Sequence, residues 1–141
     1  MNERVAKILK RHLKYSDAEL IAFKEREENA KVVNSLDFIA RMEIHFEVTS
    51  SRGCNSGHTV GQKFVLDGAG NFLADKSPKR SCMFLLHGFL PFVFAIHELV
   101  YAGIAPKDIV LKFPNFGCPD VGVENCGWGH VNMHVSVVEI K

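Results

Sequence analysis

The sequence predicts an α+β domain in which a small, mainly antiparallel sheet packs on one buried apolar helix, with a helical arm at the N-terminus. Three observations predict this fold class. Residues 42–49 and 131–140 alternate apolar and polar side chains, as half-buried strands do. Residues 82–103 form one long apolar run, and residues 5–23 repeat apolar side chains at helical spacing. We therefore expect an arm over residues 1–36 and a core domain over residues 42–141.

The composition is that of a globular domain that works in a reducing compartment. The chain has 141 residues, of which 47% are hydrophobic and 23% charged, enough for one core. A net charge of +1 gives no electrostatic reason to expect a nucleic acid or an anionic membrane as a partner. The first residues carry charges throughout and lack the apolar stretch of a signal peptide. Four cysteines without such a signal indicate free thiols, so we expect a cytoplasmic protein.

The arm is predicted to contain two short helices. The segment SDAE at residues 16–19 is a capping box, in which Ser16 and Glu19 each accept a hydrogen bond from the other's backbone N–H. Two such helices cannot bury their apolar stripes alone, so they must dock on the core domain or on a second subunit. We therefore expect a homo-oligomer that is joined through the N-terminal helices. The apolar stripes comprise Val5, Ile8, Leu9 and Leu13, followed by Leu20, Ile21 and Phe23.

The core domain is predicted to begin with two strands. Residues 42–49 (MEIHFEVT) form the first strand, and residues 62–66 (QKFVL) form the second. The segment DGAGN at residues 67–71 is a turn, because Gly and Asn accept a positive φ. The side chains of the first strand that face the core are Met42, Ile44, Phe46 and Val48.

The apolar run at residues 82–103 is predicted to be a buried helix. A membrane span is not expected, because His87, Pro91, His97 and Glu98 interrupt the run. Pro91 should kink the helix or mark a break between two pieces. Gly103 is placed to end the helix.

The last part of the chain is predicted to contain two strands around a long loop. Residues 108–113 (DIVLKF) are expected to form the first of them, and residues 131–140 the closing strand. Residues 114–130 lack a regular pattern, and long irregular segments in compact domains are often functional. Trp128 in this segment either walls a pocket or plugs the core, and we favour the core.

Cysteine and histidine recur together in two loops. Cys54 and His58, like Cys126 and His130, are separated by three residues. Zinc and iron take thiolate and imidazole ligands, four in a closed site and three in an open one. The spacing therefore indicates metal binding, with small buried thiols that merely pack as the alternative.

A second reading of the cysteines needs no metal. Cys82 stands where a helix is expected to begin, and a helix N-terminus favours the thiolate. Cys118 is followed closely by Asp120, so a carboxylate lies near that thiol. Either cysteine is then a candidate nucleophile or acid/base group.

Several stretches share a pattern with known proteins. They read GCNSGHTVGQKFVLDGAGN, SPKRSCMFLLHGFLPFVFA and GCPDVGV, with the closing strand VNMHVSVVEI. Over about residues 42–140 this pattern resembles a family of small uncharacterised microbial proteins, frequent in anaerobes, and the arm looks like an addition found in a longer branch. The family shares a Cys-x2-Gly-His stretch, a middle cysteine before an apolar helix with a proline, and a late Cys-Pro-Asp. The matching positions are Cys54, Gly57, His58, Gly61, Phe64, Cys82, Pro91, Cys118, Pro119 and Asp120.

The resemblance implies a ligand set. It groups Cys54, His58, Cys82 and Cys118, in preference to the pair formed by Cys126 with its histidine. Three thiols and one imidazole suit zinc or iron(II). Four bound ligands would make a closed, structural site, whereas an open position could polarise a substrate.

The expected function is a small metal-dependent enzyme of the lyase or hydratase type that acts on a small organic molecule. Asp120, Glu124 and His130 are the candidate acids or bases near such a metal. One alternative is a non-catalytic module whose cysteines are structural or redox-sensing, and another is a metal-free cysteine enzyme. An enzyme should show a cavity beside the thiols, lined by Trp128 or phenylalanines, whereas a structural site should be buried without a pocket.

Overall fold

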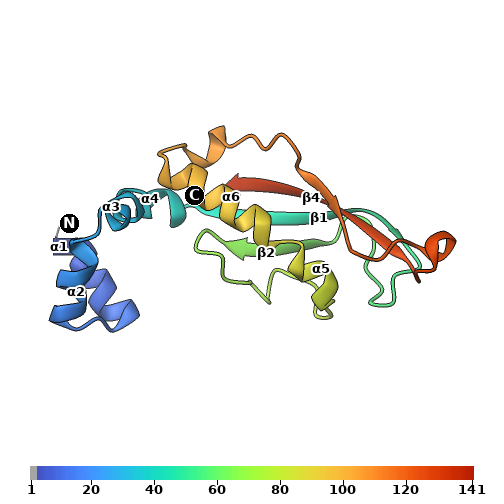
Figure 1. Cartoon of the computed structure of the whole chain (residues 1–141), viewed down its shortest axis with the longest axis horizontal. Coiled ribbons are helices and arrows are strands. Elements are labelled where there is room, and N and C mark those ends of the chain that lie inside the picture. Colours follow the sequence, from blue (N-terminus) through green and yellow to red (C-terminus); the bar gives the residue numbers. More distant parts are fainter. Residues whose placement is uncertain (1–2) are drawn as a thin grey trace.

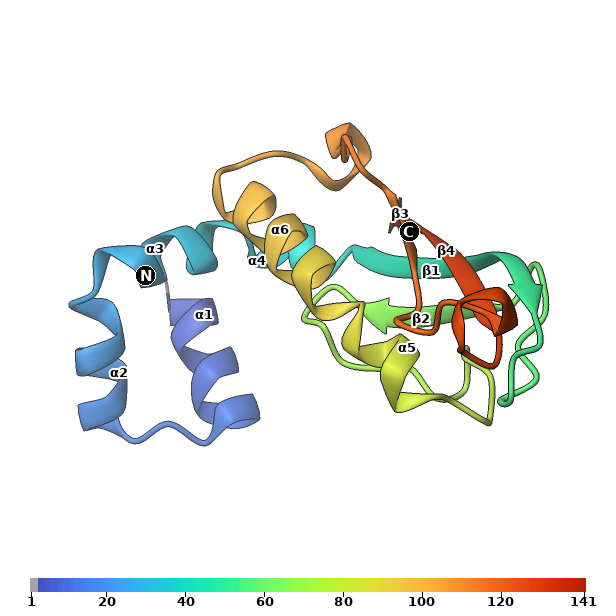
Figure 2. The same cartoon turned by 45° about the vertical axis from the view of Figure 1, so that its right-hand side comes forward.

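The computed structural model describes residues 3–141 and confirms the α+β class (Figure 1). The first two residues of the expected arm lie outside the described residues. Figures 1 and 2 show the first helices lying apart from the sheet and joined to it through α3 and α4. The arm comprises α1 (Glu3–Ile8), the π-helical turn Leu9–Leu13, α2 (Asp17–Lys24), α3 (Glu27–Asn34) and α4 (Leu36–Ile39).

The sheet is antiparallel throughout and has the order β2-β1-β4-β3. Its strands are β1 (Met42–Arg52), β2 (Lys63–Asp67), β3 (Asn115–Gly117) and β4 (His130–Glu139). β1 is central and pairs with β4 along nearly its whole length, with a register shift between Val48 and Ser50. The last pair of this ladder is Arg52 with His130, so the loop after β1 and the loop before β4 leave the sheet at the same point.

The apolar run forms two helices, α5 (Met83–His87) and α6 (Leu90–Tyr101). The prediction of a kink or break near Pro91 is confirmed as a break, and this proline lies in the first turn of α6, where its missing N–H costs little. α6 ends as expected at Gly103, which has φ 91°. The N–H groups of Gly103 and Ile104 bond to the carbonyls of Val100 and Leu99, a Schellman motif that satisfies two terminal carbonyls.

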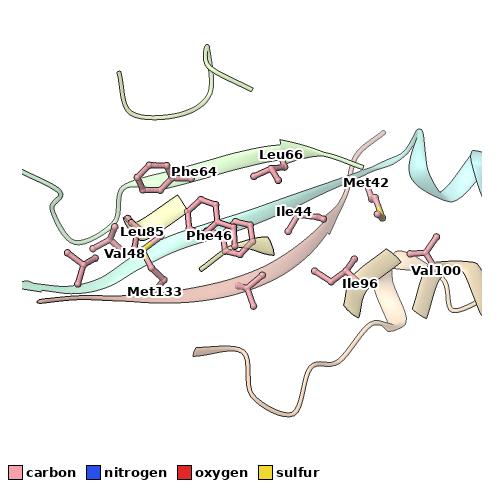
Figure 3. Packing of buried hydrophobic residues seen from close by; sticks show 13 residues of the cluster. Met42, Ile44, Phe46, Val48, Phe64, Leu66, Leu85, Ile96, Val100 and Met133 are labelled. Atoms are coloured by element: carbon pink, nitrogen blue, oxygen red, sulfur yellow. The ribbon is translucent and has the colours of Figure 1, made fainter. Parts of the chain in front are cut away.

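The core lies between the sheet and these two helices (Figure 3). The predicted alternation of β1 is confirmed, because its inward side chains are buried. Phe46 is the centre of the packing. Its ring stacks on Phe89 with centroids 3.9 Å apart, and it meets Phe92 and Phe116 edge-on at 6.2 Å and 5.9 Å. Strand β1 and the helix pair are thus held together largely by aromatic contacts.

The outer face of the helix pair remains in contact with solvent. Ile96 and Val100 are fully buried against the sheet, whereas Met83, Phe84 and Phe94 are exposed. Among residues 3–141 one helical segment, Met83–Tyr101, is long and apolar enough to cross a membrane by length and composition alone, a test that core helices of globular proteins also pass.

The predicted strand at residues 108–113 is wrong. Pro106–Asp108 form a 3-10 turn, and residues 109–113 make no ladder in the sheet. Ile109 and Leu111 pack against the core, while Val110 points to solvent. The alternating pattern of this segment therefore results from burial of one side of the chain and not from strand pairing. The free edge of β4 is occupied instead by β3 and by Pro114, whose carbonyl accepts the N–H of Val135 at 2.8 Å.

The face of the sheet opposite the helices carries a buried carboxylate. Glu43 is buried on β1, forms an ion pair with Lys76 and lies 2.9 Å from His45 Nε2. The bond from Lys76, followed by that from His45, holds the pKa of Glu43 below its usual range. The carboxylate is therefore paired rather than solvated.

The arm has its own small core. The capping box is confirmed, because Ser16 N–H donates to Glu19 Oε2 at 2.8 Å and Glu19 N–H donates to Ser16 Oγ at 3.3 Å. Only part of the expected stripes is covered, and three of their side chains remain exposed, namely Ile8, Leu13 and Ile21. The covered part centres on Val5, Leu9 and Leu20. At the end of α3, Ser35 Oγ donates to the Val100 carbonyl at 2.9 Å and ties the arm to the core domain.

Replacing Phe46 by alanine should lower the free energy of unfolding by about 3–5 kcal/mol, because a fully buried, stacked ring is lost. The control Phe94→Ala removes a ring that is 63% exposed and should change it by less than about 0.5 kcal/mol. Urea denaturation followed by circular dichroism measures both values. Equal losses would contradict this assignment of the core.

Candidate functional site

A cavity of about 520 Å³ lies at the end of the sheet where β1 stops and β4 begins. Its walls come from the loop after β1, the start of α5 and the segment between β3 and β4, which lie at one end of the molecule in Figures 1 and 2. Its size is in the range of small-molecule sites. The lining residues are Cys54, Asn55, Ser56, His58, Cys82, Phe84, Leu85, Cys118, Pro119, Asp120, Gly127, Trp128, Gly129, His130 and Val131.

Glycines allow the two loops that bear cysteine and histidine to touch. Beyond the last ladder pair, the backbones of Gly53 and Gly129 approach so closely that a Cβ on Gly129 would lie 2.2 Å from the Gly53 carbonyl oxygen. A Cβ on Gly53, which has φ 63°, would lie 2.8 Å from the Trp128 carbonyl oxygen. Any side chain at either position would force the loops apart.

Asp120 organises the loop before β4. Its carboxylate accepts the backbone N–H of Gly122 and of Trp128 at Oδ1, at 3.1 Å and 3.0 Å, and that of Gly129 at Oδ2, at 3.0 Å. These bonds, with that from Gly129 the largest, hold the pKa of Asp120 below its usual range. The carboxylate is therefore an anion at neutral pH, which suits a loop anchor better than a proton donor.

His58 is 4% exposed and has one ring nitrogen with no partner. Its Nδ1 lies 3.2 Å from Gln62 Oε1, and the N–H of Thr59 donates to that same oxygen at 3.2 Å. The Thr59 N–H can only donate, so the Gln62 atom is the amide oxygen, and Nδ1 must donate its proton to bond with it. The lone pair of Nε2 is then unpaired, and no hydrogen-bond partner for it exists among the described residues.

His130 lies in the same cavity, but both of its nitrogens are engaged. Nδ1 is 2.5 Å from the Asp120 carbonyl oxygen, which can only accept, so Nδ1 donates. Nε2 is 2.9 Å from Asn132 Oδ1, and the amide nitrogen of Asn132 donates to Ser50 Oγ at 2.8 Å. The ring is thus held in place from both sides, unlike the ring of His58.

Three of the four thiols line the cavity. Cys118 Sγ accepts the N–H of Val131 at 3.3 Å and lies 4.0 Å from His130 Nδ1. Cys82 is the residue that precedes the first turn of α5, as predicted. Cys54 opens a turn that closes with a 3.0 Å bond from Gly57 N–H to the Cys54 carbonyl. The fourth thiol, Cys126, is exposed and lies outside the lining, and all four cysteines are free.

The structure brings most of the predicted site residues to one cavity. Asp120 and His130 line it together with the four residues of the predicted ligand set. Glu124 does not, because it lies on the surface with Arg52, whose Nη1 is 3.5 Å from its carboxylate. In residues 3–141 no three His, Cys, Asp or Glu side chains stand close enough together to hold a metal ion as they are placed. The donors therefore share a cavity without converging on one point.

Several residues of the site were not predicted. The interpretation of Trp128 as a core residue is wrong, since its side chain is 78% exposed and walls the cavity. Its position between two glycines in a polar loop is the signal that could have indicated an exposed side chain. Phe84 faces away from the buried stripe of its helix, whereas Gln62 and Asn132 act across turns and strands, where no local pattern marks them.

Comparisons with known proteins give no match: no protein-family model, no curated protein and no solved structure matches this chain. The resemblance to the microbial family stays a prediction, as does the ligand set that it implies. The geometry itself supplies a cavity with three thiols and one unpartnered imidazole nitrogen.

The backbone amides of Gly122, Trp128 and Gly129 should titrate together with the Asp120 carboxylate, because they donate to it. The midpoint should lie below about 3.9, the ordinary value for aspartate, since these bonds favour the anion. Because folding lowers the pKa of Asp120, the carboxylate stabilises the folded state at pH values above its ordinary pKa. This stabilisation is lost as the pH falls through the lowered pKa.

Amide NMR shifts followed from pH 7 to pH 2 measure the midpoint. The control Asp120→Asn should abolish the shared titration. A midpoint above about 3.9 in the wild type would contradict the anchoring role.

Proposed function

We propose that this protein is a small metal-dependent enzyme whose cavity binds one zinc or iron(II) ion and takes a small organic molecule beside it. The proposed ligands are Cys54, His58, Cys82 and Cys118. The observation that carries the proposal is the unpartnered, buried Nε2 of His58, a residue that lines the cavity together with three thiols.

The state of His58 supports a ligand role. A buried nitrogen without a partner costs about 1–3 kcal/mol, so proteins seldom keep one without a use. Histidines that bind metals donate their second ring N–H to an oxygen, which sets the tautomer and aims the free lone pair. The bond from Nδ1 to Gln62 has this form. Gln62 would therefore be the outer partner that keeps His58 ready to bind.

The thiols supply the soft donors that zinc and iron(II) take. Cys118 Sγ already accepts a backbone N–H, from Val131, at 3.3 Å. Three of the four donors lie in loops, Cys54 and His58 after β1 and Cys118 before β4. Binding would draw these loops together, so metal binding and loop order should be coupled.

The remaining polar groups have distinct roles in this proposal. The metal, when bound, would supply Lewis-acid polarisation of the substrate. His130 is the candidate for proton transfer at Nε2, and Asn132 and the Asp120 carbonyl hold its ring in position. The carboxylate of Asp120 keeps the loop folded. A lyase or hydratase needs a polarising group and a positioned proton carrier of this kind.

One observation favours a second candidate, a metal-free cysteine enzyme. Cys118 lies 4.0 Å from His130 Nδ1 and accepts a backbone N–H, which are the surroundings of an activated thiol. However, His130 Nδ1 donates to the Asp120 carbonyl and is not free to take the thiol proton. This reading also leaves the unpartnered nitrogen of His58 unused, so the metal site ranks first. The open cavity with aromatic walls argues against a purely structural site.

Elemental analysis of anaerobically purified protein should find about one zinc or iron per chain. Cys54→Ser and His58→Ala should each lose most of this metal, because each removes a proposed ligand. The matched control is Cys126→Ser, which removes an exposed thiol outside the cavity and should keep the metal.

Equal metal contents in all four proteins, or no metal in the wild type, would contradict the proposed site. In the second case the cysteine-enzyme candidate predicts that iodoacetamide labels Cys118 much faster than Cys54 or Cys82.

We also propose that the arm joins copies of the chain. Ile8, Leu13 and Ile21 remain exposed on helices that cover little of one another's apolar surface, and such surfaces are typical of interfaces. Ile21→Glu should therefore shift the protein toward monomer in sedimentation velocity. Val60→Glu, at an exposed apolar position of the core domain, is the control and should not. A wild-type protein that sediments as a monomer would contradict the proposal.

A further inference from the structure

We propose that the molecule taken by this cavity is small, has a flat apolar body and carries no negative charge. The inference rests on the proposed function only for the location of the site, since it concerns the walls of the cavity and not the metal. Three properties of the walls support it: their aromatic surface, their charge and their size.

Two large aromatic side chains face the cavity from different elements. Phe84 comes from α5 and is 72% exposed, and Trp128 comes from the loop before β4 and is 78% exposed. The lining also includes Leu85, Pro119 and Val131, and it is mostly apolar. Apolar walls with a few polar groups at one end are typical of small-molecule sites, and aromatic faces stack well on flat ligands.

The charges of the cavity exclude an anionic ligand. Among the described residues that line it there is no lysine or arginine to pair with a carboxylate or phosphate. Asp120 is an anion whose four hydrogen bonds from backbone N–H groups are already made within its own loop. An anion would therefore lose its hydration and meet repulsion without a counter-charge.

The size of the cavity places its ligand among small molecules. A volume of about 520 Å³ lies within the range for small-molecule sites. A cavity of about 150 Å³ already takes benzene, so this one has room for more than one ring. A substituted benzene is therefore a probe that fits this space without filling it.

The chain carries its own reporter for this test, because Trp128 is its only tryptophan. Benzyl alcohol and benzoate are matched probes, alike in shape and different in charge. Titration of the full-length protein with benzyl alcohol should shift the Trp128 emission to shorter wavelength and saturate, because the probe displaces water from the indole. Benzoate should bind at least about tenfold more weakly, because it meets like charge without a partner.

Phe84→Ala should weaken benzyl alcohol binding by about tenfold, through loss of one stacking wall. Phe94→Ala is the matched control, since Phe94 is also exposed on the same helical run but does not line the cavity. Both positions are exposed, so both variants should fold. An equal loss in the two variants, benzoate binding as tight as that of benzyl alcohol, or no saturable change with either probe would each overturn the inference.

The titration separates this inference from the metal site when it is repeated after chelation. Selective binding of benzyl alcohol by a protein that contains no metal would support the proposed ligand class and contradict the metal site. Metal that is present in the wild type and lost in Cys54→Ser, together with no probe binding, would support the metal site and contradict the ligand class.

Discussion

The backbones of Gly53 and Gly129 meet at the end of the β1–β4 ladder, and this contact brings the two loops that carry cysteine and histidine into one place. The long pairing of β1 with β4 aims both loops at the same end of the sheet. The packing of Phe46 on Phe89 then sets the helix pair against β1, and Cys82, just before α5, lines the same cavity. The site is assembled from three segments that are far apart in the sequence. It thus depends on the close backbone contact between Gly53 and Gly129, which only residues without a side chain permit.

The elements with a repeating pattern could be predicted because burial imposes that pattern locally. The alternation in β1 and β4, the capping box at Ser16 and the end of α6 at Gly103 each follow from contacts within a few residues. The segment at residues 108–113 shows the limit of such reasoning. Alternation reports which side of a chain is buried, but a ladder also needs a free edge, and the edge of β4 is taken by residues 114–117.

The residues that line the site were easier to predict than the hydrogen bonds that its two histidines make. The resemblance named Cys54, His58, Cys82 and Cys118 as a group, and all four line one cavity. His58 and His130 stand at the same spacing from a cysteine, so the sequence treats them alike. Their difference comes from distant partners: Gln62 leaves one nitrogen of His58 free, whereas the Asp120 carbonyl and Asn132 engage both nitrogens of His130. Such pairings depend on tertiary structure and leave no local signature.

The central claim is that the unpartnered nitrogen of His58 and the three thiols are ligands of one soft metal. The most direct test is X-ray absorption spectroscopy at the metal edge of the purified protein, which identifies the atoms bound to the ion. We predict that the spectrum of the wild-type protein shows three sulfur donors together with one imidazole. A spectrum that contains only oxygen and nitrogen donors, or sulfur donors without an imidazole, would contradict this ligand set.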